Sequence, residues 1–95
     1  MEVIEHKSGA WFFLKEGDDF YINVSCSRGF ADFSLAVQLN GSEKMHYLEQ
    51  GVDFINDLGD VIALKSDIDH PRNINNKELL ADIHESIMQW KQRQT

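Results

Sequence analysis

Residues that could do chemistry are few and scattered in this chain. Cys26 is its one cysteine, and it falls among the inward-facing alternates of a predicted strand, which favours a small buried side chain over a nucleophile. Asp67, Asp69 and His70 form the run D-I-D-H, which could hold a hard cation, but the further oxygen ligands and closing glutamate of a calcium loop are missing. The histidines stand singly, with no two at metal-binding spacing on one helix; they are His6, His46, His70 and His84. We therefore predict no catalytic residue, no metal and no cofactor.

The strongest charge pattern is a row of carboxylates along one side of a predicted helix. It consists of Glu49, Asp53, Asp57 and Asp60, with no lysine or arginine between them. Like charges one helical turn apart destabilise a helix by about 0.2–0.5 kcal/mol per pair, so the row does not serve the stability of the helix. It is either an ordinary solvated surface or a docking surface for a basic protein.

Length and composition exclude several classes of protein. The 95 residues predict a single domain over 1–95, and 42% apolar with 26% charged residues is ordinary globular composition. Nine basic and sixteen acidic residues give a net charge of -7, which repels nucleic acids and anionic membranes. No apolar run approaches the roughly 20 residues of a membrane span, and the first residues lack the pattern of a signal peptide. We expect a cytoplasmic protein, and the single cysteine fits a reducing compartment.

Alternating apolar residues predict three antiparallel strands, at residues 10–16, 20–27 and 31–39. A turn at Gly17 and Asp18 defines the first hairpin, and it pairs Trp11 with Val24 and Phe13 with Ile22. A turn at Arg28 and Gly29, or a longer loop over 27–30, defines the second. The second hairpin then pairs Val24 with Phe33, Ile22 with Leu35 and Phe20 with Val37. Both turns bring the same apolar residues to one face.

The reverse face of this predicted sheet is less polar than a solvated face should be. Its register places Phe12 opposite Asn23 and Leu14 opposite Tyr21, with Ala36 beyond Tyr21. Glu2 to His6 could add a fourth strand, or the tail could fold across the strip. The alternative interpretation is that the strip is a contact surface for a second copy of the chain or for another protein. Phe12, Leu14, Tyr21 and Asn23 are therefore candidate partner-binding residues, as are the four carboxylates above.

A helix is predicted over residues 42–65, where Asn40 and Glu43 form a capping box. Its apolar side, which we expect to dock on the sheet, carries Met45, Leu48, Val52, Ile55 and Ile62. Gly51 and Gly59 fall within that apolar sector. Close backbone approach would explain them, and the rival reading is a break near Gly59.

A second helix is predicted over residues 76–93, after the loop at 66–76. Asn75 or Asn76 caps it, and Glu78 stands three residues after Asn75 as a capping-box partner. Its apolar stripe is narrow and consists of Leu79, Leu80, Ile83, Ile87 and Trp90.

These elements predict an α+β fold: a three-stranded antiparallel meander, with a possible fourth N-terminal strand, and two C-terminal helices packed on one face. The expected function is that of a small cytoplasmic, non-enzymatic protein-interaction or regulatory module, including a homodimer through the reverse face. One alternative is an acidic inhibitor or immunity-type protein that neutralises a basic enzyme. The other is a small enzyme or metal-binding protein that uses Cys26 or the loop with Asp67, Asp69 and His70.

Overall fold

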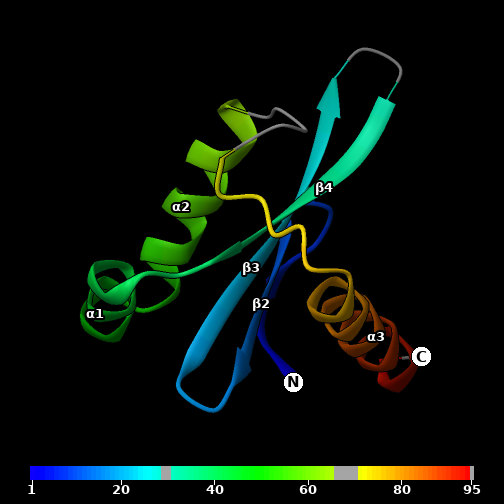
Figure 1. Ribbon diagram of the computed structural model, residues 1–95. Helices are drawn as coiled ribbons and strands as arrows, with labels where there is room; N and C mark the ends of the chain where they lie inside the picture. Colours follow the sequence, from blue (N-terminus) through cyan, green and yellow to red (C-terminus); the bar gives the residue numbers. More distant parts are fainter. Residues whose placement is uncertain (29–30, 66–70, 95) are drawn as a thin grey trace.

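A four-stranded antiparallel sheet lies between helices in the computed structural model of this chain, which describes residues 1–28, 31–65 and 71–94 (Figure 1). The strands follow one another in the sheet: β1 (Glu2–Lys7), β2 (Trp11–Glu16), β3 (Asp19–Arg28) and β4 (Ala31–Gln38). The helices are α1 (Gly41–Gln50), α2 (Val52–Leu64) and α3 (Lys77–Arg93). The α+β class is confirmed, with one strand and one helix more than the three strands and two helices predicted.

The first hairpin has the predicted register. Trp11 lies opposite Val24 and Phe13 opposite Ile22, and Gly17 in the turn has a φ of 60° that favours glycine. The N-terminal segment forms β1, which pairs with β2 and has an irregularity between Val3 and Glu5. It extends the edge of the sheet rather than covering a face.

The second hairpin is shifted by two residues from the predicted register. Ile22 pairs with Val37 and Val24 with Leu35, so the predicted pairing of Val24 with Phe33 is wrong. Among the described residues, the last pair joins Arg28 to Ala31, so Arg28 lies in β3 and not in the turn where it was predicted. Because side chains alternate with a period of two, a shift of two residues leaves every side chain on the same face. The apolar pattern therefore cannot distinguish the two registers.

The helix predicted over 42–65 is broken at Gly51, whose φ of 71° and ψ of -147° are accessible to glycine and strained for other residues. Asn40 and Glu43 form the predicted capping box, with both bonds at 2.9 Å. No break occurs at Gly59, which lies inside α2. A Cβ atom there would come within 2.8 Å of Cδ1 of Trp11, so close backbone approach explains this glycine.

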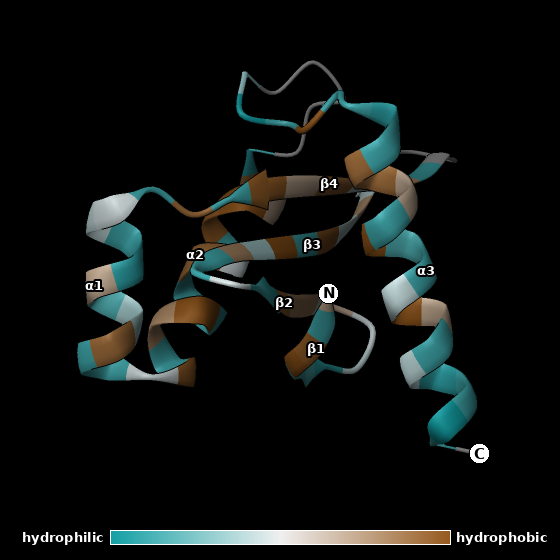
Figure 2. Ribbon diagram, turned by 60° about the horizontal axis from the view of Figure 1, so that its bottom comes forward, coloured by the Kyte–Doolittle hydropathy of each residue, from teal (hydrophilic) through white to brown (hydrophobic). Residues whose placement is uncertain are grey.

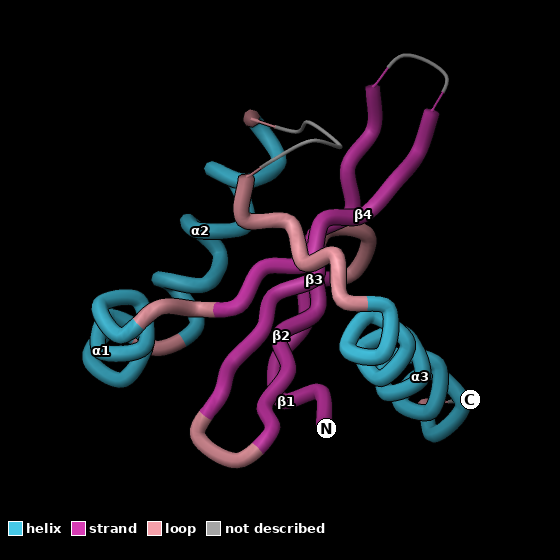
Figure 3. Tube along the Cα trace, viewed as in Figure 1, coloured by secondary structure: helices cyan, strands magenta, loops and turns pink. Residues whose placement is uncertain are grey.

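The two faces of the sheet are covered by different helices (Figure 3). The front face, which carries Trp11, Phe13 and Ile22, packs against α2; the back face, which carries Leu14 and Tyr21, packs against α3. The prediction that both helices pack on one face is wrong. The apolar stripe of α3 shows that one side of the helix is buried, but it does not specify which face of the sheet covers it.

Residues 71–76, which lead into α3, cross the outer edge of β4 on the way to the back face (Figure 1). The backbone N–H of Ile74 donates to the carbonyl of Ala36 at 2.8 Å, and the N–H of Ala36 donates to Oδ1 of Asn73 at 3.2 Å. Arg72 donates to both carboxylate oxygens of Glu43, at 2.6 and 2.9 Å, and to the carbonyl of Gln38. These bonds satisfy edge groups of β4 that would otherwise be open to pairing with another chain.

Candidate functional site

The strip predicted as a contact surface on the reverse face is a second core. Leu14 and Tyr21 are 0% and 6% exposed and form a buried cluster with Ala36, Ile83 and Ile87. Because α3 covers Leu14 and Tyr21, a homodimer through this strip would require α3 to move away. The strip therefore does not offer an interface in this structure. The sequence signal that could have shown this is the strip itself, since an apolar sheet face and an unassigned apolar helix stripe can cover each other.

Two other members of the strip lie nearer its border. Phe12 is half-buried, with its ring centroid 5.5 Å from that of Trp90 on α3. Asn23 is buried between its cross-strand neighbours Phe12 and Ala36, and its Oδ1 atom has no hydrogen-bond partner among the described residues. A buried carbonyl oxygen without a partner destabilises a fold by about 1–3 kcal/mol. Asn23 is therefore the one member of the strip that packing does not explain.

The four predicted carboxylates lie on the other side of the sheet and are all exposed. Glu49 is on α1, and Asp53, Asp57 and Asp60 follow one another at successive turns of α2. Within the described part of the chain, none of the four forms an ion pair with a lysine, arginine or histidine. Gly51 divides the row into two parts, because the helix that carries Glu49 ends there.

The same break exposes apolar residues that we expected in the core. Ile55 and Ile62 of α2 are buried as predicted, but Met45, Leu48 and Val52 are 61%, 74% and 42% exposed. None of the ten residues of α1 is buried, although this helix carries hydrophobic as well as hydrophilic residues, as the colours of Figure 2 show. In a continuous helix, Met45 and Leu48 would lie on the same face as Ile55 and would pack against the sheet. The turn at Gly51 instead gives α1 a different direction.

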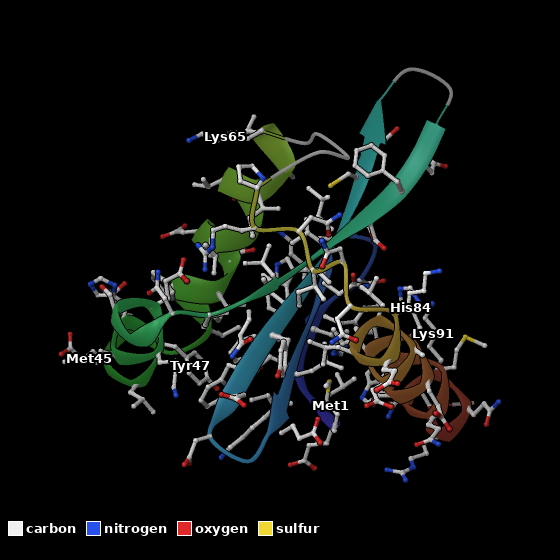
Figure 4. All side chains as sticks on the ribbon, in the orientation of Figure 1. Met1, Met45, Tyr47, Lys65, His84 and Lys91 are labelled. Atoms are coloured by element: carbon white, nitrogen blue, oxygen red, sulfur yellow. The ribbon has the colours of Figure 1, made fainter. Side chains whose placement is uncertain are left out.

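Tyr47 anchors α1 to the front face. The Tyr47 ring lies 4.7 Å from the Phe13 ring and 5.5 Å from the Phe20 ring, measured between centroids. Burial, with a further contribution from Glu5, raises the pKa of Tyr47, as expected for a phenol whose ring is enclosed. Figure 4 shows Met45 on the side of α1 away from the sheet, while Tyr47 lies on the side toward it.

We call seven of the exposed residues on these two helices the α1–α2 surface. It has an apolar part and an acidic part, and its members are Met45, Leu48, Val52, Glu49, Asp53, Asp57 and Asp60. Sequence reasoning found the acidic part and assigned the apolar part to the core. The signal for its exposure was Gly51, since a glycine between two amphipathic segments favours a change of direction.

The predicted chemical groups do not come together. Cys26 is buried, and burial raises the pKa of its thiol, which is the opposite of what activates a nucleophile. The His6 ring is tilted against the Trp90 ring, with 4.4 Å between the ring centroids, and the His46 ring lies 5.3 Å from the Phe54 ring. Among the described residues, no group of three histidine, cysteine or acidic side chains is placed to hold a metal. Asp67, Asp69 and His70 lie outside the described residues.

No helix in the described part of the chain combines the length and apolar character needed to cross a bilayer. Comparison with protein families, with curated proteins and with solved structures found no match for this chain.

Proposed function

We propose that this chain is a small, non-enzymatic protein-interaction module whose contact surface is the α1–α2 surface. The observation that carries the proposal is the exposure of Met45 and Leu48, at 61% and 74%, on a helix that buries none of its residues. Neighbouring exposed apolar side chains with a polar rim are typical of protein interfaces. A helix that served only to cover the core would turn these residues inward.

The charge of the surface indicates the chemistry of the partner. Glu49 follows Leu48 directly in α1, and Asp53 follows Val52 at the start of α2. A protein with apolar side chains bordered by lysine or arginine would therefore complement the surface. The net charge of -7 would also accelerate its approach at low ionic strength. If the partner is a basic enzyme, this chain would act as its acidic inhibitor. A cytoplasmic location remains a prediction.

A second copy of this chain is a poorer occupant of the surface. Two copies related by a twofold axis would bring their own rows of carboxylates together, and like charges at an interface oppose association. We therefore favour a basic protein over a homodimer at this surface. Light scattering on the purified chain provides a separate check, with a monomer as the expected result.

The test is to capture a binding protein from the native host and then measure its affinity for purified variants. Leu48→Ser removes an apolar anchor, and Asp53→Lys with Asp57→Lys reverses the acidic row. The matched control is Asp82→Lys with Glu85→Lys, which reverses two exposed carboxylates on α3. All these positions are exposed, so circular dichroism should show wild-type folding in every variant.

We expect Leu48→Ser to weaken binding about tenfold, as for a central apolar contact. The reversal on α2 should slow association by about tenfold or more at low salt, with a smaller effect at high salt. The control on α3 should bind as the wild type does. If the captured protein binds all variants equally, or the α3 variant loses as much affinity as the α2 variant, the proposal is wrong.

A further inference from the structure

The two edges of the sheet differ in how their backbone groups are satisfied. At the β4 edge, the carbonyl of Ala36 accepts from Ile74 and its N–H donates to Asn73. β1 is the strand at the opposite edge, as Figure 2 shows. Among the described residues, its one backbone hydrogen bond outside the pairing with β2 lies in the turn, from the N–H of Ala10 to the carbonyl of Lys7 at 2.9 Å. The outer side of β1 is therefore open to another strand.

The register of the sheet identifies the free backbone groups of β1. The N–H of Ser25 donates to the carbonyl of Ala10, so the even-numbered residues of β2 direct their backbone groups toward β3 and the odd-numbered residues toward β1. Opposite the odd-numbered residues, and thus bonded within the sheet, lie Glu2, Glu5 and Lys7. Val3 and His6 lie opposite even-numbered residues, so their N–H and carbonyl groups point outward.

Two features of β1 limit which strands can pair with it. The register shifts between Val3 and Glu5, and such an irregularity interrupts the row of backbone groups. Glu2, Glu5 and Lys7 also place charges along a strand of six residues. Charged residues on an edge oppose pairing with unselected chains. The open edge therefore suits a short segment whose charge matches its surroundings.

The charges beside this edge favour a basic segment. A hollow of about 220 Å³ joins the end of β1 to the start of α2, and its lining consists of His6, Lys7, Trp11, Val52, Asp53 and Asn56. Val52 and Asp53 belong to the α1–α2 surface, so that surface and the β1 edge are continuous. The Nζ atom of Lys7 donates to Oδ1 of Asn56 at 3.3 Å, whereas Asp53 forms no ion pair among the described residues. The Asp53 carboxylate can therefore accept from a lysine or arginine of another protein.

We propose that a short, extended, basic segment of the partner pairs with the outer edge of β1 and forms a fifth strand of the sheet. This inference rests on the proposed function, since it places part of a basic partner beside the α1–α2 surface. The backbone of the segment bonds to Val3 and His6, and its basic side chains, on the face toward α2, pair with Asp53. A second copy of the chain suits the edge less well, because two chains of net charge -7 repel each other.

Three synthetic peptides separate the backbone contribution from the charge. The first is a hexapeptide of alternating lysine and valine, which places every lysine on one face of a strand. The second has glutamate in place of lysine, and the third has the first sequence with an N-methyl group on every residue, which removes the amide donors and keeps the side chains. Each is titrated into the isotope-labelled full chain, and binding is followed by the amide signals of β1. We expect the first peptide to bind about fivefold or more tightly than either of the others, and less tightly as salt increases.

Two substitutions at one position test the assigned edge. His6→Pro removes the outward N–H, which the sheet does not use, and His6→Ala removes the same imidazole ring but keeps the N–H. His6→Pro should bind the lysine peptide about fivefold or more weakly than His6→Ala does. Asp53→Lys should abolish the preference for the lysine peptide over the glutamate peptide. In the wild type, the lysine peptide should protect the N–H of His6 from hydrogen exchange and change that of Glu5 little, because Glu5 is already bonded to β2.

Several results would overturn this inference. They are binding that leaves the β1 signals unchanged, equal binding of the three peptides, and equal binding by His6→Pro and His6→Ala. A wild-type dimer that His6→Pro dissociates would assign the edge to a second copy instead. If His6→Pro fails to fold, the N-methylated peptide and the exchange of the His6 N–H decide the matter. None of these results alters the test with Leu48→Ser, so the proposed function and this inference can fail separately.

Discussion

The front and back faces of the sheet pack against their helices in different ways. Among the described residues, eleven buried side chains form the front core and five form the back core. The front core lies under α2 and has a backbone contact at Gly59, whereas the back core has the unpaired Asn23 and a cavity at its border. We therefore expect the larger front core to contribute more to stability than the back core. The smaller core borders a buried polar side chain, that of Asn23, which lowers its contribution to stability.

The largest expected effect tests this difference with a matched pair of substitutions. Ile55 on α2 and Ile83 on α3 are both 0% exposed and face opposite sides of the sheet. Truncation of a buried isoleucine to alanine destabilises a protein by about 2–5 kcal/mol, with the larger losses where the surroundings cannot collapse. We expect Ile55→Ala to fall near the upper end of that range and Ile83→Ala near the lower end, as measured by denaturant unfolding. Equal losses, or a larger loss for Ile83→Ala, would contradict the comparison.

The next effect concerns the close approach of α2 to the front face. Gly59→Ala places a methyl group within 2.8 Å of Cδ1 of the buried Trp11. We expect a loss of about 2 kcal/mol, because overpacking exceeds the gain of about 1 kcal/mol in helix propensity. The control is Gly41→Ala in α1, where no neighbouring atom lies within 4 Å and stability should stay within about 0.5 kcal/mol of wild type. A stabilised Gly59→Ala variant would show that α2 packs less closely than described.

The third effect concerns the break that exposes α1. Gly51 has a φ of 71°, so Gly51→Ala should destabilise the protein by about 1–2 kcal/mol through backbone strain. If α1 and α2 could instead join into one helix, alanine would stabilise it, and Met45 would become protected. Thermal unfolding distinguishes these signs, and oxidation of Met45 by peroxide reports its exposure in the variant.

The smallest effect concerns the crossover from the front helices to the back face. Hydrogen bonding from Arg72 lowers the pKa of Glu43, and Arg72 is 40% exposed, so solvent screens the pair. Glu43→Gln keeps a capping-box side chain but removes the charge, and should destabilise by about 1 kcal/mol at pH 7.

The pH dependence of that loss follows from the direction of the shift. Because the pKa of Glu43 is lower in the folded chain, its stabilisation is fully present above the unfolded pKa of about 4.3, and is lost as pH falls through the folded pKa. The difference between wild type and Glu43→Gln should therefore shrink below about pH 4. Glu78→Gln is the control. Glu78 lies in the first turn of α3, where its charge interacts with the helix dipole, so this variant should be destabilised by a few tenths of a kcal/mol. If the difference in stability between wild type and Glu43→Gln did not change with pH, the ion pair between Glu43 and Arg72 would not contribute to stability.

The capping residues show how local physics made parts of the fold predictable. Asn40 and Glu43 form the predicted box within three residues of each other, and Asn76 accepts from the backbone N–H groups of Glu78 and Leu79. Glu78 forms no box in the structure, because the cap is Asn76 rather than Asn75. Such signals act over one turn of chain, so the identity of nearby residues is sufficient to predict them.

The candidate surfaces were less predictable, for a related reason. The acidic row could be recognised from residue types, since charged side chains remain exposed in almost any packing. Leu48 and Asn23 could not be placed, because an apolar residue at helical spacing and a polar residue on a sheet face acquire their environment from segments distant in sequence.

By itself, the sequence determined where the main strands lie, which of their residues share a face, and where the first and last helices begin. These follow from alternation, turn residues and caps, which are properties of the local chain. Only the tertiary structure decided that α3 crosses to the back face, that α1 turns outward at Gly51, and that β3 and β4 pair two residues further along. An apolar stripe requires burial but does not name the surface that buries it, and a two-residue shift preserves every face, so packing between distant segments makes those choices.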